Sequence, residues 1–160
     1  MSNRPDVQII KPPNTLMKVK TGSGRVKPDA EALKRAEAAV KKIGNDFPQW
    51  AQGDLDEMDK ALAAARKDPD RQEDYIMQIF RRSMEVKGQG GSFGYDLISQ
   101  VGDSLKKFTE SRKDASPRDV EIIAAHVNAM RVVMVEDIKG DGGAVGRAIV
   151  DGLHKLTVKP

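Results

Sequence analysis

The residues with the clearest chemical potential lie between Arg81 and Tyr95, in the segment RRSMEVKGQGGSFGY. Glycine-rich runs such as this one occur in loops that hold phosphate groups. A dinucleotide-binding fingerprint, however, needs a preceding strand and a βαβ unit, and a P-loop needs Gly-Lys-Ser/Thr after its glycines. The helical pattern on either side of the segment and the residues after its glycines exclude both.

In this segment the sequence resembles the histidine phosphotransfer (HPt) family, whose motif reads His-x-x-Lys-Gly, then small residues, then Gly and an apolar residue. The positions that match in register are Lys87, Gly88, Gly91, Ser92, Gly94 and Tyr95. The resemblance covers about residues 47–138. It implies an all-α, up-down-up-down four-helix bundle that relays phosphate in two-component signalling.

Each matching residue has a possible role beside a phosphoryl group. Lys87 lies one helical turn beyond position 84, so its ammonium could stand beside phosphate oxygens. Gly88 leaves the neighbouring surface without a side chain, which would let a partner's aspartyl-phosphate loop approach. We expect Gly91 and Gly94 to form a tight turn into the next helix.

Met84 occupies the position of the family's phosphate-accepting histidine. A thioether has no titratable proton and cannot replace an imidazole nucleophile, so we expect no catalytic residue here. Met84 lies about 100° around the helix from the inward position Ser83, which places it at the edge of the core or on the surface. There it would offer a partner an adaptable apolar contact. The predicted partner-binding residues are Arg81, Met84, Glu85, Lys87, Gly88, Gly91 and Ser92.

Other candidate sites carry weaker patterns. His126 lies near the apolar positions Ile122 and Ile123, which is typical of a hydrogen-bonded, partly buried histidine, and His154 lacks a lysine-glycine context. Asp137 and Asp141 would suit a calcium loop, but a lysine and an alanine fall on its other ligand positions. We therefore expect neither a metal site nor a cofactor.

Composition supports a helical protein. Of the 160 residues, 39% are hydrophobic and only 4% aromatic, which favours packed helices over a β-sandwich. Cysteine is absent, which excludes disulfides, thiolate metal sites and cysteine nucleophiles. No apolar run approaches the roughly 20 residues of a membrane-spanning helix, so we expect a soluble, cytoplasmic protein with no membrane partner.

Charge and helical periodicity divide the chain into three parts. Residues 1–28 carry six basic residues against one acidic residue, a net charge of +5 within a total of +3. Together with their prolines and glycines, this predicts a flexible basic arm, in which Val7–Ile10 could dock as a strand-like segment. Residues 29–138 form the predicted HPt-like bundle, and residues 139–160 a C-terminal helical extension.

The periodic segments predict where helices begin and end. Between residues 29 and 66, Gly44 and Pro48 interrupt the pattern, so either two helices meet there or one long helix kinks. Further helices are expected from about residue 70 to 87, from 92 to 111, from 117 to 138 and from 145 to 156. The sequence Ser116-Pro117-Arg118-Asp119 is a helix-start signal.

Three functions remain open from the sequence. The first is an HPt-like protein, not an enzyme, that binds the receiver domain of a response regulator or a hybrid histidine kinase without accepting phosphate. The second is a genuine phosphotransfer protein, altered at position 84 or using another histidine. The third is a structural or nucleic-acid-associated helical protein using its basic arm. Nucleic acid is not our expected partner, because no aromatic residue accompanies those charges.

Overall fold

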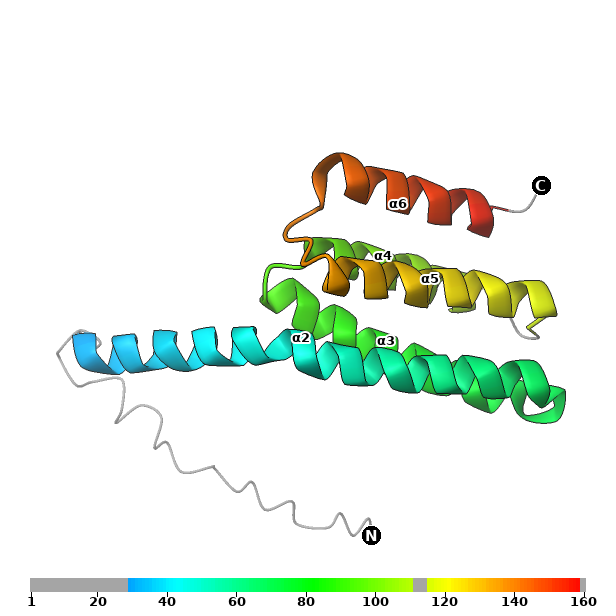
Figure 1. Ribbon diagram of the computed structural model, residues 1–160, viewed down its shortest axis with the longest axis horizontal. Coiled ribbons are helices and arrows are strands. Elements are labelled where there is room, and N and C mark those ends of the chain that lie inside the picture. Colours follow the sequence, from blue (N-terminus) through cyan, green and yellow to red (C-terminus); the bar gives the residue numbers. More distant parts are fainter. Residues whose placement is uncertain (1–28, 111–114, 159–160) are drawn as a thin grey trace, which may run out of the picture. The chain divides into compact units, whose positions relative to one another are not determined.

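A computed structural model of the protein describes residues 29–110 and 115–158, so the predicted arm, including Val7–Ile10, lies outside the described residues. The elements in chain order are α2 (Ala30–Lys67), the short 3₁₀-helix η1 (Pro69–Arg71), α3 (Gln72–Ser92), α4 (Asp96–Glu110), α5 (Pro117–Val135) and α6 (Gly143–Thr157) (Figure 1). Within the described ranges there is no strand, which confirms the all-α prediction.

The chain divides into two units, residues 1–37 and 38–160. In the first unit, residues 29–37 are exposed and contain the start of α2, where the Glu31 N–H donates to the Asp29 carboxylate at 3.2 Å. The second unit contains the rest of α2 and all later helices. In it α6, part of the predicted C-terminal extension, packs against α4 and α5.

Helix α2 answers the question left open at Gly44 and Pro48, because it continues through both residues. Proline removes one backbone hydrogen bond from a helix interior and normally bends or breaks it. Here Phe47 and Ala51 are buried on either side of the proline. The Phe47 ring also packs against the Phe93 ring, with centroids 5.3 Å apart. Tertiary packing thus holds the helix together where local propensity disfavours it.

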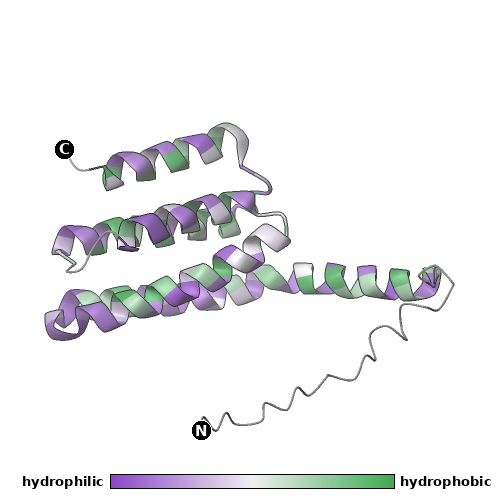
Figure 2. Cartoon of the chain, turned by 180° about the vertical axis from the view of Figure 1, so that it is seen from behind, coloured by the Kyte–Doolittle hydropathy of each residue, from purple (hydrophilic) through white to green (hydrophobic). Residues whose placement is uncertain are grey.

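The core is mostly aliphatic, as the low aromatic content requires. Its largest fully buried apolar side chains are Phe47, Leu55, Met58, Ile79, Val86, Tyr95, Leu97, Ile98, Leu105, Ile123 and Met130. Most come from the apolar stripes of α2 to α5, and Figure 2 shows apolar and polar residues interspersed along these helices. None of the described helices is both long and apolar enough to cross a bilayer.

Charged side chains join α2 to its neighbours. Arg131 of α5 donates hydrogen bonds to Gln52 at 3.0 Å and to Asp59 at 2.7 Å, both on α2. A second link joins α2 to α3, where Arg82 donates a hydrogen bond to Asp54 of α2 at 2.8 Å. Such partly exposed pairs contribute only about 0–1 kcal/mol each, so they orient helices that apolar burial holds together.

Helix α5 begins as its sequence signal predicts. Ser116 is the N-cap, and its hydroxyl accepts from the Asp119 N–H at 3.2 Å. In return the Asp119 carboxylate accepts from the Ser116 N–H at 2.8 Å, and Pro117 follows the cap. This reciprocal capping box satisfies donors that a helix start leaves unpaired.

The boundary between α3 and α4 differs from the prediction. Helix α3 continues to Ser92 and α4 begins at Asp96, so Gly91 is helical and does not form the turn. The turn depends on Gly94, whose φ of +80° is in the left-handed region that favours glycine. The prediction was wrong for Gly91 because α3 continues through this residue, whose surroundings include the Ser99 hydroxyl of α4, a contact that periodicity within one helix cannot reveal.

Candidate functional site

The predicted partner-binding residues lie on the C-terminal half of α3. Arg81, Glu85, Gly88 and Ser92 recur every three or four residues and are exposed. Met84 is half-buried, so of its two expected positions, the edge of the core or the surface, the structure shows the first. Together with Lys87 and Gly91, these residues are called the docking face below.

Two glycines of the docking face have different surroundings. A Cβ atom added at Gly88 would meet nothing within 4 Å, so the surface beside Met84 is open. A Cβ atom at Gly91 would come within 2.8 Å of the Ser99 Oγ on α4. Gly88 thus leaves room outside the molecule, whereas Gly91 leaves room for the neighbouring helix.

The charge of Lys87 is compensated within the protein. Its ammonium group forms an ion pair with Asp103 on α4. Its stem lies over Gly102, where an added Cβ would come within 2.8 Å of the Lys87 Cβ. The side chain is only 28% exposed. Because an internal carboxylate already neutralises it, Lys87 attracts an external anion less than a free lysine would.

The motif did not reveal Gly102, Asp103 or Ser99, which complete this arrangement. The Ser99 hydroxyl donates to the Lys87 carbonyl at 3.3 Å. One signal was present, because glycine inside an amphipathic helix costs about 1 kcal/mol relative to alanine and so indicates close packing. The sequence offers no way to know that α3 is what packs there.

Two residues of the weak calcium-loop pattern, Asp137 and Lys139, contact the side chain of Tyr95. The Tyr95 hydroxyl, on a fully buried residue, donates to the Asp137 carboxylate at 2.5 Å. Lys139 lies 3.3 Å from the same carboxylate and 3.5 Å from the centroid of the Tyr95 ring. Burial and this hydrogen bond raise the pKa of Tyr95, while the Tyr95 hydrogen bond lowers the pKa of Asp137. In the described residues no cluster of carboxylates and histidines could hold a metal ion.

The hydrogen bonding predicted for His126 is confirmed, but the residue is more deeply buried than the sequence indicated. It is fully buried, and its Nδ1 lies 2.8 Å from the Ile122 carbonyl oxygen. A carbonyl only accepts, so Nδ1 carries the proton, and Nε2 accepts from the Ser104 hydroxyl at 2.9 Å. Burial lowers the pKa of His126, which favours this neutral form. His154, in contrast, is exposed on α6.

Three comparisons with known proteins found nothing similar to this chain. A scan against protein-family models found no match, and neither the curated proteins nor the solved structures contained one. The functional argument therefore depends on the docking face and on the resemblance of its motif.

Proposed function

We propose that the protein is an HPt-like signalling protein of two-component phosphorelay systems, which binds receiver domains without accepting phosphate. In this proposal α3, α4, α5 and the C-terminal half of α2 are the four helices of an up-down-up-down bundle, and the protein acts in the cytoplasm. The observation that carries the proposal is the open surface at Gly88, beside the half-buried Met84 and Lys87.

The same surface supports binding without phosphate transfer. Met84 offers no nucleophile, and the Lys87 ammonium that would stabilise a phosphoryl group is paired with Asp103. His126 is a poor substitute, because both of its ring nitrogens are hydrogen-bonded inside the core. The protein would therefore act as an adaptor or competitor for receiver domains, including those of hybrid histidine kinases.

The docking face is tested by adding a side chain where the structure leaves space. Gly88→Arg should keep the fold but block a partner, and Gly152→Arg on α6 is its matched control, because both glycines have no atom within 4 Å of an added Cβ. Binding to purified receiver domains activated with beryllofluoride should fall at least tenfold for Gly88→Arg only. Equal binding by both variants would contradict the proposal. Loss of binding only on deletion of residues 1–28 would favour the basic arm instead.

A second experiment separates binding from transfer. After incubation with phosphorylated receiver domains, the wild-type protein should carry no acid-labile phosphate. The variant Met84→His restores the missing nucleophile at the same position. Phosphate on this variant but not on the wild type would support loss of the acceptor alone. Phosphate on the wild type would show a genuine phosphotransfer protein and contradict the proposal.

A further inference from the structure

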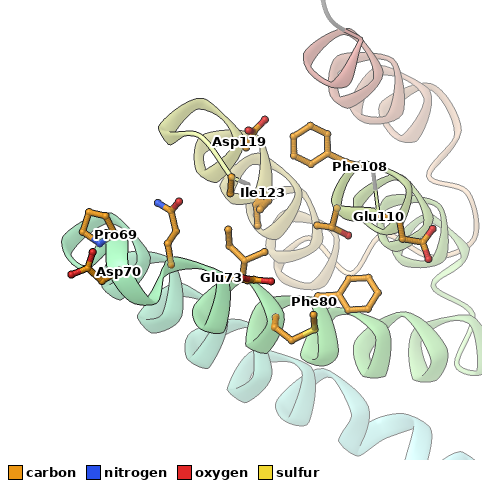
Figure 3. A pocket seen from close by; sticks show the side chains of 13 residues that line it. Pro69, Asp70, Glu73, Phe80, Phe108, Glu110, Asp119 and Ile123 are labelled. Atoms are coloured by element: carbon orange, nitrogen blue, oxygen red, sulfur yellow. The ribbon is translucent and has the colours of Figure 1, made fainter. Parts of the chain in front are cut away.

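A cavity of about 370 Å³ opens along the N-terminal half of α3, and none of the docking-face residues lines it (Figure 3). Residues of η1, α3, α4 and α5 line it. Its apolar lining comes from Ile76, Met77, Phe80, Phe108 and Ile123. Its volume lies in the range of small-molecule sites, which are mostly apolar with a few polar groups that orient the ligand.

The charged lining of the cavity is entirely acidic in the described residues. The carboxylates that line it belong to Asp70, Glu73, Glu110 and Asp119. Asp119 belongs to the capping box, and Glu110 lies 3.7 Å from the Lys106 ammonium. Asp70 and Glu73 are exposed and form no ion pair with any described residue.

The helix starts that border the cavity, and the neighbouring Arg71, already lie beside acidic residues. The first turns of α3 and α5 would favour an anion, but Glu73 and Asp119 already supply negative charge there. Arg71 is engaged by Asp74, at 3.5 Å, and lies over the Tyr75 ring.

We propose that this cavity binds a small organic cation, with an apolar body against Phe80 and Ile123 and a protonated amine near Asp70 and Glu73. Binding would release water from apolar surface, and the amine would meet two carboxylates that form no ion pair with any described residue. The proposal uses none of the docking-face residues, so it stands or falls separately from receiver binding.

Three indole compounds with a common body and different charge test the ligand class. Tryptamine is a cation, tryptophol is neutral and indole-3-propionate is an anion at pH 7. In calorimetric titrations of the full chain, tryptamine should bind most tightly and indole-3-propionate most weakly. Amide resonances shifted by tryptamine should lie around Ile76, Phe80 and Ile123. Equal affinity for the cation and the anion, or shifts elsewhere only, would overturn the proposal.

Two glutamates, one inside the cavity and one outside it, provide a matched pair. Glu73→Gln should weaken tryptamine binding about two- to fivefold, the range of an exposed ion pair, and leave tryptophol binding unchanged. Glu136→Gln removes an exposed charge that does not line the cavity, so it should change the binding of neither compound. A third variant, Ile76→Trp, should fill the cavity and lower the affinity for both compounds at least tenfold, with its fold checked by circular dichroism. Equal effects of Glu73→Gln and Glu136→Gln, or unchanged binding to Ile76→Trp, would overturn the proposal.

Discussion

The two ends of helix α3 face α4 in opposite ways. At the C-terminal end, Gly90 lies so close to Ile98 that an added Cβ would come within 2.9 Å of its Cγ2 atom. At the N-terminal end, Phe80 of α3 and Phe108 of α4 line a cavity of about 370 Å³. One end of the contact is closed by small residues, and the other end is hollow.

The difference shows how residue size changes the packing along one helix pair. At Gly90 and Gly91 the missing Cβ atoms make room for the Ile98 and Ser99 side chains of α4. At the other end, larger side chains such as Ile76, Phe80 and Phe108 line a cavity. Variants that change volume at the two ends should therefore have opposite effects.

The largest effect is expected from opening a space at the closed end. Ile98 is fully buried, so Ile98→Ala should lower the free energy of unfolding by about 2–5 kcal/mol. Gly90→Ala should then cost at least about 0.5 kcal/mol less in this background than in the wild type, because the Ile98 Cγ2 atom is gone. Urea unfolding of the four proteins measures this coupling. Strictly additive effects would show that Gly90 and Ile98 do not limit the approach of the helices.

Larger side chains should have different stability costs at the two ends of α3. Val86 is 1% exposed, so Val86→Phe should cost about 1–3 kcal/mol or more through overpacking. Ile76 lines the cavity, so Ile76→Phe should change stability by less than about 1 kcal/mol, because the added ring has space. Thermal unfolding of both variants compares the two costs. Similar costs would mean that the cavity is not present in solution.

The buried His126 makes stability depend on pH through the packing of α4 and α5. Burial lowers its pKa below the ordinary 6.5, so the unfolded chain binds this proton more tightly than the folded protein does. The stability that the neutral, buried His126 contributes is fully present above pH 6.5. As the pH falls below 6.5, the free energy of unfolding decreases by up to about 1.4 kcal/mol per pH unit. Urea unfolding at pH 7.5 and 5.5 measures this slope.

Variants of the two histidines test whether His126 causes this change of stability with pH. His126→Gln should remove most of it, although it lowers the stability itself because the core must rearrange. His154→Gln on α6 is the control and should leave the slope in place. A slope that survives His126→Gln would mean that other groups cause the pH dependence.

The smallest effect is expected at the docking face. Gly88→Ala should raise stability by about 0.5–1 kcal/mol, because alanine is the better helix former and its Cβ meets nothing within 4 Å. Gly90→Ala gains the same propensity but meets Ile98, so it should be destabilising by about 1 kcal/mol. Paired thermal unfolding distinguishes the two glycines. A gain at both positions would show that the contact with α4 yields easily.

Local sequence patterns predicted much of this molecule because they act within a few residues. The helix start at Ser116, the incomplete burial of Met84 and the hydrogen-bonded state of His126 were each predicted from residue types and spacing along one helix. The role of Gly91 was mispredicted, since the atom that an added Cβ would meet there, the Ser99 Oγ, belongs to another helix.

By itself, the sequence determined the helical class, most helix boundaries and the absence of an imidazole at position 84. These depend on local propensity, apolar periodicity and residue identity, which need no knowledge of neighbours. Only the tertiary structure decided that α2 continues through Pro48, that Asp103 neutralises Lys87, and that a cavity opens beside Glu73. Each of these depends on which side chains of different helices come into contact, and that is a property of packing.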